Sequence, residues 1–149
     1  MPELESINKI SEFEDKSLLI VDDDNPFRER LARAMSKKGF IVSQAESVKA
    51  GIESVISTKP AFAVVDLRLN DGNGLEVVKE IQKNNSTSRI IMLTGYGNIP
   101  TAVAAIKEGA IDYLAKPADA DDVEKALLAD PDKKAAPPES PMSADRVKW

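Results

Sequence analysis

The chain alternates between short apolar runs and longer stretches whose apolar residues recur at helical spacing. The apolar runs are bounded by turn residues and read as β-strands, whereas the longer stretches read as amphipathic helices. The predicted strands are residues 17–21, 40–44, 62–65, 90–93 and 111–114. The predicted helices are residues 26–38, 47–57, 75–83, 100–108 and 119–128. This repeated strand–helix order predicts an α/β fold with a parallel sheet.

Residues that favour helix ends support the first predicted helix. Asn25 is predicted as its N-cap, Pro26 suits its first turn, and Gly39 suits its end. The strand at 62–65 is almost wholly apolar, which is typical of a central parallel strand with both faces covered. The helix-end residues and the apolar strand at 62–65 therefore support the same parallel α/β fold as the strand–helix alternation does.

The two ends of the chain do not follow the alternation. Residues 1–16 are predicted to be an N-terminal extension, and they lack the basic and apolar regions of a signal peptide. Four prolines stand among charged and small residues after position 130, so residues 131–149 are predicted to be an extended linker. Residues 143–149 are typical of a capped helix that would begin a further domain. A frayed tail with one tryptophan is the alternative.

Composition narrows the possible chemistry. The chain has no cysteine, which excludes disulfides and zinc–thiolate sites, and no histidine, which excludes a phosphohistidine intermediate of its own. A net charge of −5 argues against nucleic-acid binding by this part of the protein alone. No apolar run approaches the ~20 residues needed to cross a bilayer, so a cytoplasmic location is expected.

Acidic residues stand where two predicted strands end. Asp22, Asp23 and Asp24 follow the first strand and Asp66 follows the third. Each alone has an ordinary explanation, as a residue that favours a helix start or caps a turn. If the strands are parallel neighbours, the four carboxylates converge at the carboxyl edge of the sheet, where open α/β folds bind ligands. A hard divalent cation such as Mg²⁺ would relieve their repulsion.

Two further polar pairs are predicted at the same edge. Thr94 and Gly95 end the fourth strand, while Lys116 and Pro117 follow the fifth. The combination favours phosphoryl transfer onto Asp66, with the Lys116 ammonium offsetting charge and the Thr94 hydroxyl donating to a bound phosphoryl group.

The predicted cation ligands are Asp23, Asp66 and the backbone carbonyl of Arg68, with Asp22 acting through water. Tyr113 is a candidate to turn inward when Thr94 moves, although it could equally be an ordinary core or surface aromatic. The Lys116–Pro117 bond is a candidate for a cis peptide.

Five motifs together resemble the receiver domain of bacterial two-component response regulators over roughly residues 17–130. They are Leu-Ile-Val-Asp-Asp-Asp at 19–24, Val-Val-Asp-Leu-Arg-Leu at 64–69, Gly74, Met-Leu-Thr-Gly at 92–95 and Asp-Tyr-Leu-Ala-Lys-Pro at 112–117. The resemblance implies a doubly wound, five-stranded, CheY-like fold with strand order 2-1-3-4-5. It also implies Asp66 as phosphoacceptor, Asp22 and Asp23 as the acidic pair, and a sensor histidine kinase as partner.

Residues 95–103 and 141–149 are similar to the RegA/PrrA/ActR-type global redox response regulators. That resemblance implies a Fis-like helix-turn-helix domain after the linker, through which DNA would be bound. We further expect that a phosphoryl group on Asp66 reshapes the surface of the fourth helix, fifth strand and fifth helix, and that the protein forms a homodimer through this face. Candidates for cross-dimer ion pairs there are Lys107, Asp112, Glu124 and Lys125, which could equally be solvated charges. Asn70 departs from the family, which commonly has proline at that position.

Two other functions fit parts of the sequence. A haloacid-dehalogenase-like phosphatase also uses an aspartate nucleophile, Mg²⁺, a threonine and a lysine, but places its nucleophile on the first strand. A receiver-like interaction module that works without phosphorylation is the second alternative. The site residues favour a phosphoacceptor switch, rather than an enzyme acting on other molecules.

Overall fold

The structure, a computed structural model, describes residues 10–95 and 99–129. Residues 10–127 form one compact unit. The helices and strands in chain order are the short 3-10 helix η1 (Ile10–Glu12), β1 (Ser17–Val21), α2 (Asn25–Lys38), β2 (Ile41–Ala45), α3 (Val48–Thr58), β3 (Phe62–Asp66), β4 (Arg68–Leu69), β5 (Gly72–Asn73), α4 (Leu75–Asn84), β6 (Arg89–Thr94), α5 (Ile99–Lys107), β7 (Asp112–Ala115) and α6 (Ala120–Leu128).

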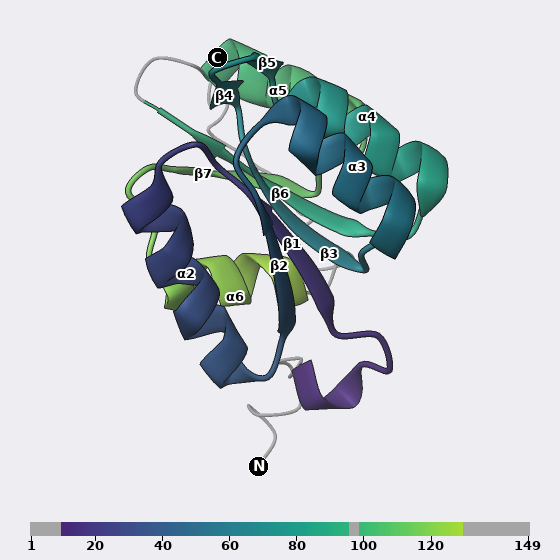
Figure 1. Cartoon of the computed structure of the whole chain (residues 1–149), viewed down its shortest axis with the longest axis vertical. Coiled ribbons are helices and arrows are strands. Elements are labelled where there is room, and N and C mark those ends of the chain that lie inside the picture. Colours follow the sequence, from purple (N-terminus) through teal and green to yellow (C-terminus); the bar gives the residue numbers. More distant parts are fainter. Residues whose placement is uncertain (1–9, 96–98, 130–149) are drawn as a thin grey trace, which may run out of the picture. The chain divides into compact units, whose positions relative to one another are not determined.

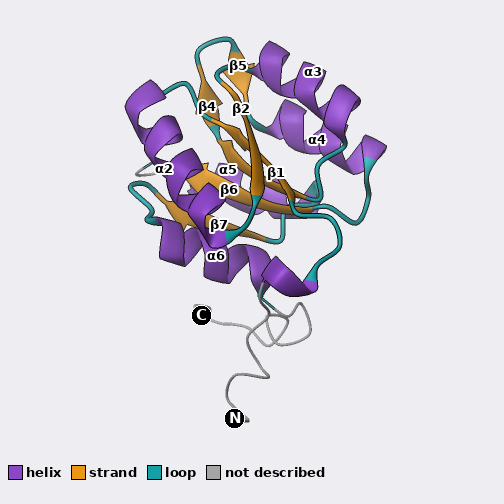
Figure 2. Ribbon diagram, turned by 60° about the horizontal axis from the view of Figure 1, so that its bottom comes forward, coloured by secondary structure: helices purple, strands orange, loops and turns teal. Residues whose placement is uncertain are grey.

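Five parallel strands form the central sheet in the order β2-β1-β3-β6-β7. Numbered by their succession along the chain, this order is 2-1-3-4-5, so the predicted topology is confirmed. Helices α2 and α6 cover one face, and α3, α4 and α5 cover the other (Figure 1). Figure 2 shows the same sandwich of helices around the strands from a second direction. The parallel α/β fold predicted from the alternation, and the doubly wound arrangement that the resemblance implied, are therefore both present (Figure 1).

The core follows from alternation along the three central strands. On β1, Leu19 and Val21 face one side of the sheet and pack with α3 and α4, as do Ala63 and Val65 on β3. Every residue of β3 is buried, which agrees with the apolar sequence of residues 62–65. A strand with both faces covered can present polar groups only at its end, and β3 ends with Asp66.

Helix α2 begins differently from the prediction. The N-cap is Asp24, not Asn25, because the Asp24 carboxylate accepts a hydrogen bond from the backbone N–H of Phe27 (3.1 Å). Asn25 is already helical, and its Oδ1 accepts from Arg28 (2.6 Å). Other predicted boundaries differ from the structure by about one residue, the usual variation at element ends.

Residues 10–16 precede the first predicted strand and pack against the amino edge of the sheet. The ring of Phe13 meets that of Phe62 edge-on, with centroids 5.3 Å apart. The guanidinium of Arg89 lies 5.3 Å from the centre of the Phe13 ring and donates a hydrogen bond to the carbonyl of Leu127 (3.1 Å). The start of β6 thus links the segment before β1 to the last turn of α6.

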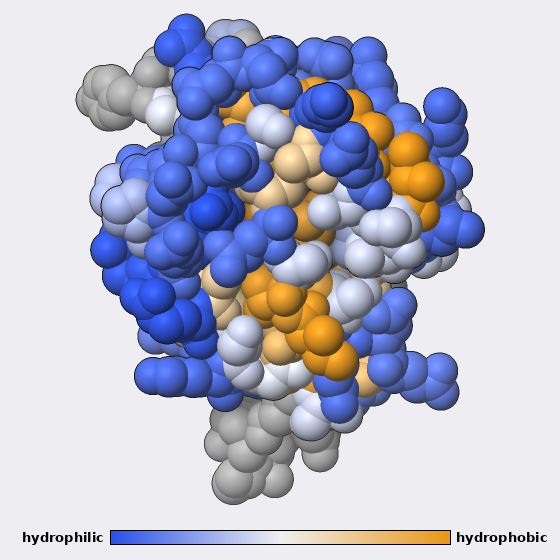
Figure 3. Space-filling view, in the orientation of Figure 1, coloured by the Kyte–Doolittle hydropathy of each residue, from blue (hydrophilic) through white to orange (hydrophobic). Residues whose placement is uncertain are grey.

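Hydrophilic side chains cover most of the face drawn in Figure 3, with apolar areas between α2 and α3. Among the exposed large apolar residues, Ile41 lies on the edge strand β2 and Ile56 lies on α3. None of the helices in the described ranges is long and apolar enough to cross a membrane.

Candidate functional site

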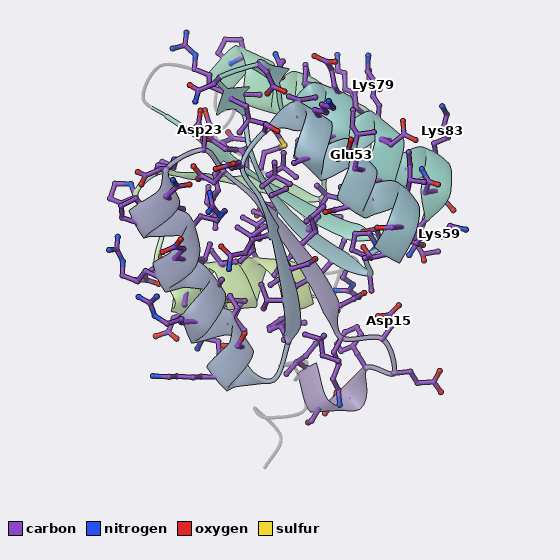
Figure 4. The ribbon with its side chains drawn as sticks, viewed as in Figure 1. Asp15, Asp23, Glu53, Lys59, Lys79 and Lys83 are labelled. Carbon is purple, nitrogen blue, oxygen red and sulfur yellow. The ribbon has the colours of Figure 1, made fainter. Side chains whose placement is uncertain are left out.

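The acidic residues predicted to converge do so at the carboxyl edge, with one exception. Carboxylate oxygens of Asp22, Asp23 and Asp66 all lie within 4.8 Å of one another. In Figure 4, Asp23 lies at the opposite end of β1 from Asp15. The exception is Asp24, whose side chain caps α2 instead of joining the cluster. Three carboxylates, not four, therefore form the acidic cluster.

Asp22 is the innermost of the three and has no solvent exposure. Its Oδ1 accepts a hydrogen bond from the backbone N–H of Asp24 (2.9 Å), and its Oδ2 accepts one from Lys116 Nζ (3.0 Å). Its own N–H donates to the carbonyl of Ala45 at the end of β2 (3.0 Å). Both the backbone and the carboxylate of Asp22 are thus fixed.

Asp66 is the last residue of β3 and is 6% exposed. Its Oδ1 accepts from the N–H of Arg68 (3.3 Å), and its Oδ2 lies 3.4 Å from Lys116 Nζ. Burial, together with the negative charge of Asp22, raises the pKa of Asp66 to about 6, although Lys116 and Arg68 oppose that rise. The carboxylate remains ionised at neutral pH, but at a cost in free energy that a cation would reduce.

Lys116 is the positive group between the two carboxylates. Its ammonium contacts both Asp22 and Asp66, and it lies 5.0 Å from the centre of the Phe27 ring on α2. Burial lowers the pKa of Lys116, but its hydrogen bonds and the charges of the two aspartates outweigh that effect and leave the pKa raised. Lys116 is therefore charged at neutral pH.

Thr94 ends β6 at the same edge and is buried. Its hydroxyl donates to the carbonyl of Gly95 (3.1 Å), and its own carbonyl accepts from the N–H of Lys116 (2.9 Å). Tyr113 on β7 is partly buried against the core. The Lys116–Pro117 bond is cis, so that prediction is confirmed. The backbone hydrogen bond between Lys116 and Thr94 therefore joins the two residues that the motifs predicted to act on the phosphoryl group.

The donor set suits a hard cation such as Mg²⁺. Three carboxylates supply oxygen ligands, which Mg²⁺ prefers, and two of the three are buried. A neighbouring positive group, Lys116, offsets part of their charge but leaves an excess of negative charge in the cluster. Arg68 lies two residues after Asp66 at the start of β4, and the role predicted for its carbonyl remains a prediction.

One buried charged residue that contacts the site was not identified by the sequence analysis. Arg28 is only 8% exposed, and its Nη1 donates to the carbonyl of Asp22 (2.9 Å) while its Nε donates to Gln44 (2.9 Å). Position 28 falls on the same helical stripe as Leu31 and Met35, so the spacing did indicate an inward side chain. Arginine is rarely buried, which is why the pattern did not reveal it.

The sequence of residues 18–128 matches the family model for the response regulator receiver domain. The chain belongs to that family. Over 135 residues the chain is 60% identical to the photosynthetic apparatus regulatory protein RegA of Rhodobacter capsulatus, and the match covers 91% of this chain and 73% of that protein. It is 59% identical to the acid tolerance regulatory protein ActR of Rhizobium meliloti (strain 1021), covering 91% of this chain and 70% of that protein.

Solved structures place the receiver in the same group. A response regulator from Burkholderia pseudomallei, solved with a phosphorylated aspartic acid, a calcium ion and citrate, has a TM-score of 0.75 and 36% identity, and the match covers 82% of this chain and 72% of that one. A CheY-like receiver from Methanospirillum hungatei has a TM-score of 0.73 and 25% identity, covering 82% and 98%. These matches support the receiver interpretation over the haloacid-dehalogenase-like one.

Proposed function

We propose that this receiver is a signalling switch that accepts a phosphoryl group on Asp66 from a partner histidine kinase in a Mg²⁺-dependent reaction. The observation that carries the proposal is the contact of one ammonium, that of Lys116, with the carboxylates of both Asp22 and Asp66. A buried strand-end carboxylate beside a fixed cation is suited to attack phosphorus, because positioning and electrostatics dominate phosphoryl transfer.

The transfer requires little covalent chemistry from the protein. An oxygen of Asp66 forms the new bond to phosphorus as the bond from phosphorus to the kinase's histidine nitrogen breaks. The N–H of Arg68 holds Oδ1 of Asp66, and Lys116 faces Oδ2, so the carboxylate is oriented before the partner arrives. Mg²⁺, held by Asp23, Asp66 and the carbonyl of Arg68, with Asp22 acting through water, would supply charge neutralisation of the phosphoryl oxygens.

The output is proposed to pass through Thr94 and Tyr113. The Thr94 hydroxyl now donates to Gly95, and a phosphoryl oxygen on Asp66 would offer it a stronger acceptor. Movement of Thr94 would make room for Tyr113, which is on the neighbouring strand and partly buried. The proposed result is a changed surface over α5, β7 and α6.

That surface is the proposed homodimer interface. Lys107 and Lys125 are exposed there and remain candidates for cross-dimer ion pairs, together with Asp112. Glu124 already pairs with Lys38 of α2 within the chain (3.2 Å), so recruiting it would require that pair to break. A phosphorylated protein that stays monomeric in size-exclusion chromatography would contradict the dimer proposal.

Control of transcription is the proposed purpose of the switch. Relatives of this chain include the regulatory proteins RegA and ActR and the transcriptional regulatory protein FixJ of Azorhizobium caulinodans. We infer that residues 17–130 act as the receiver, that residues 131–149 link it to a C-terminal effector domain, and that DNA is bound only through that domain. A cytoplasmic location, without membrane attachment, belongs to the same proposal.

Intact-mass spectrometry after incubation with acetyl phosphate and Mg²⁺ tests the acceptor. The wild-type chain should gain the mass of one phosphoryl group, while Asp66→Asn and an EDTA-treated sample should not. An adduct that survives Asp66→Asn would identify a different nucleophile. No adduct on the wild type, with acetyl phosphate or with a phosphorylated kinase, would favour a receiver-like module that works without phosphorylation.

A further inference from the structure

The loop after the phosphoacceptor is attached at its tip to another helix. Asp71 lies in the turn between β4 and β5, and its two carboxylate oxygens accept hydrogen bonds from the backbone N–H groups of Val48 (2.8 Å) and Lys49 (3.1 Å). The N-cap residue Ser47 accepts a third, from Ala50 (3.0 Å). Asp71 and Ser47 thus satisfy three amides that the start of α3 leaves without partners in the helix. Figures 1 and 2 both draw the hairpin beside this end of α3.

The hairpin needs such an anchor. Strands β4 and β5 have two residues each, and an isolated two-stranded hairpin is marginal in water even when it is longer. Asn70 occupies the position where receivers commonly carry proline, and no proline stands between residues 61 and 99. Three side chains of the hairpin have described roles: Leu69 is buried, Asn73 accepts a hydrogen bond from the N–H of the nearby Leu75 (2.8 Å), and Asp71 bonds to the start of α3. The bonds from Val48 and Lys49 hold the pKa of Asp71 below its ordinary range, so the anchor is ionised at neutral pH.

The anchored loop carries part of the acidic site. Arg68 pairs with Asn73 in the hairpin, and its N–H donates to Oδ1 of Asp66. We propose that Asp71 is a positioning residue: by fixing the hairpin to α3 it sets the backbone of Arg68, and thereby the affinity for Mg²⁺ and the rate of phosphoryl transfer to Asp66. This inference rests on the proposed function, because it takes the carbonyl of Arg68 as a ligand.

The test compares the 149-residue wild-type chain with Asp71→Ala, which loses both bonds, and Asp71→Asn, which keeps one acceptor oxygen. Calorimetric titration with MgCl₂ measures binding, and intact-mass spectrometry with acetyl phosphate measures the rate. Groups that orient metal ligands change affinity by about 10–100-fold, so Asp71→Ala should weaken Mg²⁺ binding by about tenfold. Asp71→Asn should fall between Asp71→Ala and wild type, and the phosphorylation rate should follow the same order.

Two control variants separate positioning from other effects. Ser47→Ala removes the other cap of α3 without releasing the hairpin, so it reports destabilisation of the helix start alone. Glu76→Gln removes a negative charge next to Gly72 without touching the anchor. Ser47→Ala leaves both bonds of Asp71 in place, and the exposed charge of Glu76 is largely screened at ~0.15 M salt, so both controls should stay within about twofold of the wild-type affinity. Amide hydrogen exchange at Arg68 should accelerate in Asp71→Ala and not in Ser47→Ala.

The outcomes distinguish this inference from the proposed function. If the wild type binds Mg²⁺ and Asp71→Ala binds it with the same affinity, the proposed role of Asp71 is wrong. The proposal that Asp66 is the phosphoacceptor would still stand. Equal losses in Asp71→Ala and Ser47→Ala would also overturn it, since Asp71 would then act only as a helix cap. A wild-type chain that neither binds Mg²⁺ nor accepts a phosphoryl group would overturn the proposed function, and this inference with it.

Discussion

Replacing Asp66 by asparagine should stabilise the protein in the absence of Mg²⁺. The carboxylate is almost buried beside Asp22, and its pKa is raised to about 6 from an ordinary value of 3.8. The folded state therefore favours the neutral form of the Asp66 carboxyl, yet at neutral pH this group is ionised, which lowers the stability of the fold. Asparagine has the same shape, can still accept from the N–H of Arg68, and carries no charge.

The size of the expected gain in stability follows from the rise in the pKa of Asp66. About two pH units at 1.36 kcal/mol each give an upper value of ~3 kcal/mol. Lys116 loses one of its two charged partners in the variant, which offsets part of this gain, so we expect Asp66→Asn to gain about 1–2 kcal/mol at about pH 7.5. Between pH ~4 and ~6 the folded state binds more protons at Asp66 than the unfolded state does. The free energy of unfolding of the wild type therefore falls as the pH rises through that window. The stability that Asp66→Asn gains over the wild type should increase from pH ~4 to pH ~6 and stay constant above that range.

Urea denaturation in EDTA, followed by circular dichroism from about pH 4 to 8, measures this difference. Glu53→Gln on the exposed face of α3 is the control, because it removes a charge far from the acidic edge and should change stability by less than about 0.5 kcal/mol (Figure 4). Adding Mg²⁺ should stabilise the wild type more than Asp66→Asn. A variant no more stable than wild type at pH ~7.5, or an advantage that does not change between pH ~4 and ~6, would refute the reasoning.

Three further substitutions test other parts of the structure by the same unfolding assay. Gly74→Ala would place a Cβ 2.2 Å from the carbonyl oxygen of Asp66, so it should cost about 2–3 kcal/mol; a neutral effect would show that the loop yields easily. Lys116→Met should cost about 2 kcal/mol in EDTA, because buried Asp22 loses its cation, and Mg²⁺ should recover part of the loss. Phe13→Ala should cost about 2 kcal/mol through lost aromatic packing on β3, whereas no loss would mean that residues 10–16 contribute nothing to the fold.

The sequence predicted the sheet and the acidic edge because both depend on regular spacing. Apolar runs of about five residues identify buried strands, and parallel strands bring their last residues to one edge. Asp22, Asp66 and Lys116 each follow or end such a run, so their meeting required no knowledge of individual contacts. The same reasoning predicted Thr94 at that edge, and the pairing of β6 with β7 aligns it with Ala115, the residue before Lys116.

What the sequence did not predict depends on contacts between distant residues. The β4–β5 hairpin has no length or alternation of its own, and its anchor joins Asp71 to Val48, 23 positions away. Asp24 and Asn25 are equally good caps by residue type, so only the path of the chain decides between them. The burial of Arg28 on α2 depends on the side chain of Gln44, which accepts a hydrogen bond from it and lies on β2.

Arg89 links the Phe13 ring to the last turn of α6, so the segment before β1 is held at the amino edge of the sheet, away from the acidic site. Asp15 and Asp23 stand at opposite ends of β1, whose five residues span about 16 Å (Figure 4). A dye or sensor surface attached beside Asp15 therefore lies at the end of β1 that is opposite the acidic edge (Figure 4). The proposed binding of a kinase and of Mg²⁺ can then be tested on an immobilised chain whose attachment does not block the carboxylates.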